Sequence, residues 1–128
     1  MNFKIIDAGI MNGFETLTRL GGYIMLFSIF ASILTELPLC LPIKTLLIGI
    51  TEITNGIHQL PSSGYPGSTC YVLAMAFTAF GGLSGVAQTS SMVKGCALSM
   101  KQYLLAKILL AILSGLLAYG VMYCMKPF

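Results

Sequence analysis

The sequence predicts an all-helical integral membrane protein, and three observations support this fold class. Hydrophobic residues make up 56% of the 128 residues and charged residues only 9%, whereas a soluble domain usually carries about 25% charged residues. The mean hydropathy is +0.88. A chain of this length cannot bury so much apolar surface in a single core that faces water. The long apolar runs lack the alternation of a membrane barrel, so helices are expected.

The first predicted element is an amphipathic helix over residues 1–18. Its apolar side chains recur at helical spacing: they are Phe3, Ile6, Ile10, Phe14 and Leu17. Glu15 and Arg19 form a favourable pair four residues apart. Two interpretations remain open at this point: a helix lying in the membrane interface, or the water-exposed start of the next helix.

A helix pair is predicted over residues 20–37 and 43–60. The first segment is about 18 residues of mainly apolar sequence, the lower limit for a span. Pro38 and Pro42 enclose the connection PLCLP, where they end one helix and start the next. The pair is either two membrane spans or a re-entrant hairpin with PLCLP at its tip. Both arrangements return the chain to the same side of the membrane.

Glu36 and Lys44 flank this connection. In the re-entrant arrangement both charges would lie at membrane depth and pair with each other. In the arrangement with two spans they would be ordinary interface charges, and this second interpretation is favoured.

Two further helices follow the loop at residues 61–68. Residues 69–92 begin as an apolar span and are then interrupted by GGLSG, which predicts a glycine-broken helix. Residues 102–125 form the cleanest predicted transmembrane helix. Ala111 and Gly115 provide small side chains four residues apart, a spacing suited to close helix packing.

The first candidate binding cluster lies in the segment TEITNGIHQ, residues 51–59. On a continuous helix Glu52, Asn55 and Gln59 share one face, with Thr54 alongside. A carboxylate at the centre of a bilayer costs roughly 3 kcal/mol or more, so it usually faces a cavity, an ion or a partner. The alternative is that this end of the helix has already reached the interface and the carboxylate is solvated.

The second candidate cluster is the glycine-rich break and the polar residues after it. Gly81, Gly82 and Gly85 lie on one helical face with Gln88, and Ser84 lies between them. A break here would leave backbone groups unpaired, which lipid cannot satisfy but a solute or an ion can. The alternative is a close helix crossing, because two of these glycines are also spaced as G-x-x-x-G.

Other classes of function are disfavoured. The net charge of +3 is small and scattered, so no nucleic acid is expected as a partner. The single histidine and the absence of clustered ligands predict no enzyme, no metal site and no cofactor. The four cysteines are far apart and are expected to be plain buried thiols.

Three stretches resemble a known family: NGFETLTRLGGYIMLFSIFASIL, ITEITNGI and AFGGLSGVAQ, in that order. They are similar to the C-terminal half of YlbJ-type sporulation integral membrane proteins, which belong to the nucleoside-recognition, or Gate, domain group. The resemblance runs from about residue 8 to residue 125. The motifs EITNGI (52–57) and FGGLSG (80–85) are its most specific parts.

The resemblance implies a single Gate-type domain over 1–128, with a transporter-like core. Related concentrative nucleoside transporters frame a midplane site with re-entrant hairpins and unwound helices, and by that analogy Gly82, Leu83 and Ser84 would be the unwound stretch. Family members are several times longer and carry a related first half. The expected partners are therefore the lipid bilayer, a small polar solute, and either further copies of this chain or a separate half.

The expected function is solute transport or recognition linked to sporulation, with a nucleoside-like solute or an ion as cargo. The expected location is the cell membrane, which the chain would cross several times. The residues expected to line the site are Glu52, Thr54, Asn55, Gly82, Ser84 and Gln88. The alternative function is that of a structural or assembly factor in spore envelope formation that transports nothing.

Overall fold

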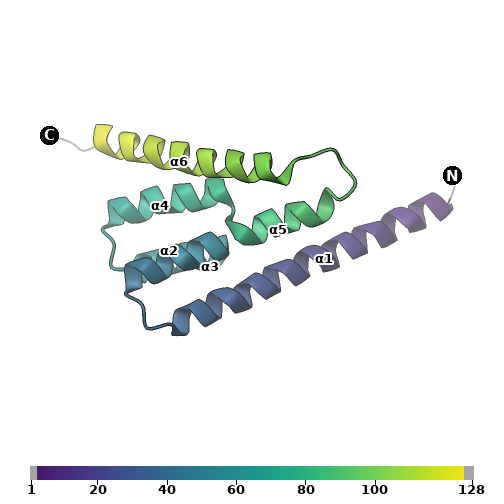
Figure 1. Ribbon diagram of the computed structural model, residues 1–128, viewed down its shortest axis with the longest axis horizontal. Coiled ribbons are helices and arrows are strands. Elements are labelled where there is room, and N and C mark those ends of the chain that lie inside the picture. Colours follow the sequence, from purple (N-terminus) through teal and green to yellow (C-terminus); the bar gives the residue numbers. More distant parts are fainter. Residues whose placement is uncertain (1–2, 126–128) are drawn as a thin grey trace.

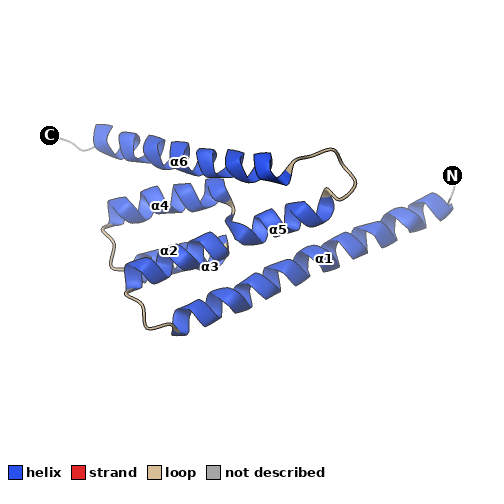
Figure 2. Cartoon of the chain, in the orientation of Figure 1, coloured by secondary structure: helices blue, strands red, loops and turns tan. Residues whose placement is uncertain are grey.

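A computed structural model describes residues 3–125, and every element in this part of the chain is helical (Figure 2). The elements are α1 (Phe3–Glu36), α2 (Leu41–Thr51), α3 (Ile53–Gln59), the short 3-10 helix η1 (Leu60–Ser62), α4 (Gly67–Phe80), α5 (Gly82–Met92) and α6 (Met100–Cys124). The predicted all-helical class is confirmed for these residues.

The amphipathic helix and the first apolar segment form one continuous helix, α1, of 34 residues. A separate element over 1–18 is therefore not seen, and the second interpretation, the exposed start of the next helix, describes the chain. The physical reason is that no proline interrupts α1, and isolated glycines weaken a helix without ending it. At 1.5 Å per residue α1 is about 51 Å long, well beyond the roughly 30 Å of a hydrocarbon core.

Helices α2 and α3 form a hairpin that is too short to cross a bilayer. The two helices have 11 and 7 residues, or about 16 and 10 Å. They lie so close that a Cβ on Gly56 would come within 2.2 Å of the Cα of Gly49. The chain reverses at Glu52, and Figure 1 shows the hairpin ending midway along the molecule. The tip is thus Glu52, so the alternative with a re-entrant hairpin tipped by PLCLP is not seen, and the segment 43–60 is not one continuous helix either.

The PLCLP segment instead connects α1 to α2. Helix α1 ends at Glu36, and Pro42 lies in the first turn of α2, as proline should. The Lys44 ammonium donates a hydrogen bond of 2.6 Å to the carbonyl of Thr35. Glu36 remains exposed. The pairing of Glu36 with Lys44 that a hairpin at PLCLP would require is absent, since the ion pair within residues 3–125 joins Arg19 to Glu15.

Helix α6 packs along α4 through small residues (Figure 1). A Cβ on Gly115 would lie 3.7 Å from the side chains of Val72 and Ala76, which is ordinary contact. The Ser114 hydroxyl donates to the carbonyl of Met75 at 3.2 Å. Glycine at this position brings the two helix backbones close together, as in other membrane helix pairs.

Within residues 3–125, three helical segments are long and apolar enough to cross a membrane: α1, the segment Gly67–Met92 that comprises α4 and α5, and α6. Their outer faces carry many exposed large apolar side chains, whereas the buried apolar core is small. A surface of this kind is stable when lipid is the solvent. The helix lengths and the apolar exterior together indicate a membrane protein.

Candidate functional site

The hairpin tip is built around the side chain of Glu52. This residue has an extended backbone (φ −145°, ψ 119°) between α2 and α3, and it is only 3% exposed. One carboxylate oxygen accepts from the backbone N–H of Thr54 at 3.1 Å and the other from that of Asn55 at 2.8 Å. A negative charge is favoured here, because a helix N-terminus presents unpaired N–H groups and a positive dipole end.

This arrangement differs from the predicted helical face of Glu52, Asn55 and Gln59. The predicted helix over 43–60 is divided at Glu52, so its carboxylate caps α3 instead of lining the side of a helix. Asn55 reaches α1, where its amide nitrogen lies 3.4 Å from the hydroxyl of Ser28. Thr54 is exposed. The sequence does not indicate a reversal at this point, because each half of the segment has acceptable helix propensity.

The break between α4 and α5 falls at two adjacent glycines. Gly81 has φ 81° and ψ 6°, and Gly82 has φ 70°. Such left-handed backbone angles are costly for residues with a Cβ. The helix resumes at Gly82, so Leu83 and Ser84 lie in the first turn of α5. The interruption is therefore shorter than the unwound stretch that the family resemblance implies.

The tip and the break are in direct contact. A Cβ on Gly82 would lie 3.2 Å from the backbone nitrogen of Ile53 and 3.3 Å from the carbonyl oxygen of Thr51. The two polar clusters singled out in the sequence, 30 residues apart, thus meet where both helices are interrupted. Figure 1 shows this meeting point near the middle of the α4–α5 segment.

The polar residues of α5 bond to one another and to α6. The amide of Gln88 donates to the Ser84 hydroxyl at 2.9 Å, and Ser84 is 2% exposed. The hydroxyls of Thr89 and Tyr103 lie 3.1 Å apart and link α5 to α6. Within residues 3–125 every buried side-chain nitrogen and oxygen has a partner. The polar side chains of α5 are therefore satisfied by partners on α5 and α6.

Lys107 also lies at the break, although its side chain was not among the predicted site residues. Its ammonium donates to the carbonyl of Ala79, in the last turn of α4, at 3.3 Å. It also lies 3.7 Å from the position of a Cβ on Gly81. The sequence could have indicated this role, because Lys107 is a charged residue inside the most apolar predicted transmembrane helix. Charged residues at such positions are often functional.

Opposite charges are thus placed at opposite helix ends. Glu52 lies at the N-terminus of α3, and Lys107 at the C-terminus of α4, each where the helix dipole favours it. Neither forms an ion pair in the described part of the chain, whose one ion pair joins Arg19 to Glu15. Both charges are held by backbone groups: the carboxylate of Glu52 by two N–H groups and the ammonium of Lys107 by a carbonyl oxygen.

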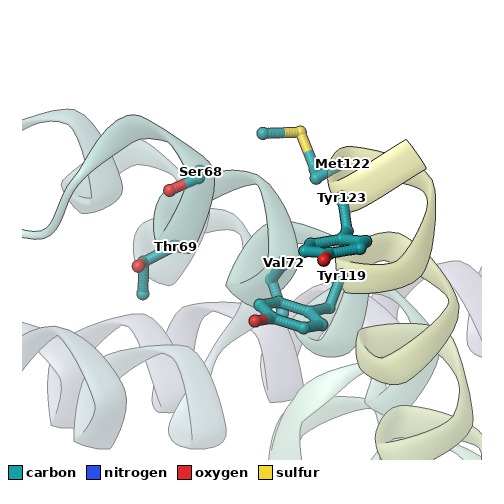
Figure 3. A pocket seen from close by; sticks show the side chains of 6 residues that line it. All are labelled: Ser68, Thr69, Val72, Tyr119, Met122 and Tyr123. Atoms are coloured by element: carbon teal, nitrogen blue, oxygen red, sulfur yellow. The ribbon is translucent and has the colours of Figure 1, made fainter. Parts of the chain in front are cut away.

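A separate cavity of about 200 Å³ lies where the start of α4 meets the end of α6 (Figure 3). Its lining consists of Ser68, Thr69, Val72, Tyr119, Met122 and Tyr123. It contains none of the predicted site residues, and its surface is mainly apolar. An apolar groove along the same helix pair shares Val72 and Tyr119 with it, so this region is continuous with the lipid-facing exterior.

Among the six predicted site residues, the structure brings Glu52 and Gly82 together at the tip and pairs Ser84 with Gln88 on α5. It directs Asn55 toward α1 and leaves Thr54 exposed. Comparisons with protein-family models, with curated proteins and with solved structures gave no match to this chain. The fold itself defines the class: an all-helical protein with three candidate membrane spans.

Proposed function

We propose that this chain is one half of a solute-transport protein of the cell membrane. The hairpin tip and the α4–α5 break would form two walls of a site for a small polar solute or an ion. The observation that carries the proposal is the contact between Gly82 and the backbone of Thr51–Ile53. In transporters, interrupted helices that meet at membrane depth supply backbone groups to the substrate.

Glu52 is the residue proposed to contact the solute. A carboxylate has about four lone-pair sites, and two are used by the N–H groups of Thr54 and Asn55. The remaining capacity suits a hydroxyl group or a cation. The carboxylate is buried and has no cationic partner among residues 3–125. A hydrogen bond that a ligand donates to it would therefore contribute more binding free energy than the same bond in water.

Gly82, Ser84 and Gln88 are proposed to supply the second wall, with Thr54 and Asn55 supporting the first. The Ser84 hydroxyl accepts from Gln88 and retains its own proton for donation, while the Gln88 amide retains its carbonyl oxygen. Both a donor and an acceptor are therefore left for a polar solute. The family resemblance supports a nucleoside-like solute or an ion, in a spore-forming bacterium.

A single hairpin and a single interrupted span supply only one side of a site. Transporters built from two repeats place the substrate between them. The proposed working unit therefore contains either a second copy of this chain or a separate partner half. Alternating access would involve movement of the hairpin against the broken span.

The test is uptake by purified protein in lipid vesicles, with labelled nucleosides and labelled alkali cations as probes. E52Q keeps the size of the side chain but removes the charge, and its single carbonyl oxygen can accept from only one of the two N–H groups that Glu52 caps, those of Thr54 and Asn55. We expect uptake to fall by about 10-fold or more, since a hydrogen bond to a charged group contributes roughly 1.5–3 kcal/mol. S84A should reduce uptake less strongly.

The matched control is E36Q, because Glu36 is an exposed carboxylate at the end of α1. Its uptake should equal that of the unmodified protein. Equal uptake by E52Q and E36Q, at equal protein levels, would remove Glu52 from the site. Absence of any protein-dependent uptake, including with candidate partner chains, would contradict the transport proposal itself.

The second candidate function is that of a membrane assembly factor in spore envelope formation. Its support is the mutual satisfaction of the buried polar groups and the close backbone approach of Gly49 to Gly56, which equally suit a purely structural helix crossing. In that case E52Q and S84A would impair assembly in proportion to their effect on protein levels. Normal levels and assembly with reduced uptake would exclude it.

A further inference from the structure

Lys107 occupies a position that is expensive for a charged residue. It lies seven residues into α6, about 10 Å along the helix axis from Met100. A lysine deep in a membrane helix costs roughly 3 kcal/mol unless its ammonium reaches water or a polar partner. The long stem of a lysine commonly extends back to the interface for this reason.

The Lys107 side chain does not extend toward the interface. It reaches across to α4 and donates to the carbonyl oxygen of Ala79. Ala79 is in the last turn of a helix that ends at Phe80. Carbonyl groups in the last turn of a helix have no partner within that helix, so they form a negative pole at the break.

The surroundings of the ammonium are well defined. It lies above the Tyr103 ring, 5.9 Å from the centroid, where a cation is attracted by the face of an aromatic ring. It is also close to Gly81, whose left-handed backbone turns the chain from α4 into α5. A positive charge is thus fixed between an aromatic face and a helix C-terminus, directly at the interruption.

Interrupted membrane helices commonly leave such carbonyl groups free to bind a dissolved monovalent cation. We propose that Lys107 is a tethered cation for the α4–α5 break. Its ammonium occupies the position at the carbonyl end of α4 that a dissolved Na⁺ or K⁺ would otherwise take. The break is consequently stable without any added alkali cation.

The proposal concerns the same break as the proposed transport site, but its test does not depend on transport. The measurement is thermal unfolding of the purified full chain in detergent, in chloride salts of equal ionic strength. The cations are Na⁺, K⁺, NH₄⁺ and choline, the last being too large and without an N–H donor. The unmodified protein should have the same Tm in all four salts.

K107A removes the tethered ammonium and leaves space for a small cation. In choline chloride we expect its Tm to fall on the order of 5–10 °C, since a charged hydrogen bond is lost. Na⁺, K⁺ or NH₄⁺ should restore at least half of that loss. A residue that only fills space would show no such selective recovery.

Two further variants serve as controls. K101A removes an exposed lysine from the start of the same helix and should behave as the unmodified protein does. K107R keeps a permanent positive charge, so its Tm should be the same in all four salts. This variant still tests the proposal if K107A fails to fold.

The proposal is overturned if the unmodified protein is stabilised by Na⁺ or K⁺ over choline. It is also overturned if K107A melts at one temperature in every salt, or if K107R acquires a cation requirement. Failure of vesicle uptake with the expected melting pattern would contradict only the transport proposal.

Discussion

At the scale of single residues, Glu52 is a buried carboxylate with a defined local role. It is 3% exposed, and both of its oxygens accept backbone N–H groups of α3. Its role as the cap of α3 depends on a chain reversal, and that reversal depends on a close approach of Gly49 to Gly56. Such pairing is a long-range property that helical periodicity does not encode.

The glycine contact yields a stability prediction. G56A places a methyl group within 2.2 Å of the Cα of Gly49, and backbone cannot yield as a flexible side chain can. Overpacking of this kind should cost about 1–3 kcal/mol. Thermal unfolding in detergent would detect it as a clearly lower Tm.

The matched control for that prediction is G85A. Gly85 lies within α5, and a Cβ there meets nothing within 4 Å. Alanine should be neutral or stabilising, by up to about 1 kcal/mol of helix propensity. If G56A and G85A melted at the same temperature, the close hairpin packing would be wrong.

Lys107 illustrates a different limit at the residue scale. Its presence in an apolar helix was visible in the sequence, but its partner is a backbone carbonyl, that of Ala79. Every residue has a backbone carbonyl, so the sequence does not show which carbonyl Lys107 binds. That partner can be identified only after the end of α4 has been located.

At the scale of elements, the apolar segments were predicted more accurately than their connections. The predicted segments 69–92 and 102–125 overlap Gly67–Met92 and α6 closely. The predicted connection between 20–37 and 43–60 agrees with the end of α1 at Glu36 and the start of α2 at Leu41, whereas the predicted boundary near residue 19, drawn at a polarity change, is not seen and the break at Glu52 was not predicted. Helix α1 tolerates such a change without a break, whereas the chain reverses at Glu52 between two segments of helix-compatible sequence.

The hairpin predicts a distinctive labelling pattern. In a background without the native cysteines, L41C and S62C should react with a membrane-impermeant thiol reagent from one side. K94C, in the connection between α5 and α6, should react only from the other side. I50C, near the tip, should be protected from both sides because the hairpin ends at membrane depth.

Intact cells and inverted membrane vesicles distinguish the two sides in this experiment. Labelling of I50C from the side opposite to L41C would indicate that α2 and α3 cross the bilayer completely. Labelling of L41C and S62C from different sides would contradict the hairpin. Either pattern requires a topology other than the one in Figure 1.

At the scale of the whole molecule, the three candidate spans place the start of α1 and the connection between α5 and α6 at the same end (Figure 1). The two spans or full-depth hairpin expected over 20–60 would have put these regions on opposite sides of the membrane. With a single span before the hairpin, Lys4, Lys94 and Lys101 belong to one end. Among the described residues, Lys44 belongs to the other end.

This distribution predicts that the N-terminal end faces the cytoplasm, since short loops on that side carry the excess of lysine and arginine. A fluorescent protein fused before Met1 should fold and fluoresce in cells. A reporter enzyme that is active only outside the cytoplasm should be active when inserted in the connection between η1 and α4, residues 63–66. The opposite pair of results would reverse the orientation.

The half-depth hairpin also has a consequence for biogenesis. The 11 residues of α2 are too few to be inserted as a span by the machinery that threads helices into lipid. The hairpin is expected to enter the bilayer against other helices, which are α1, made before it, and the later α4–α5 segment, which contacts it through Phe77 and Gly82. When synthesis has reached Gln59, the α4–α5 segment has not yet been made. We therefore expect the hairpin to remain near the membrane surface until that segment has been made, and the tip to contact the break late in folding.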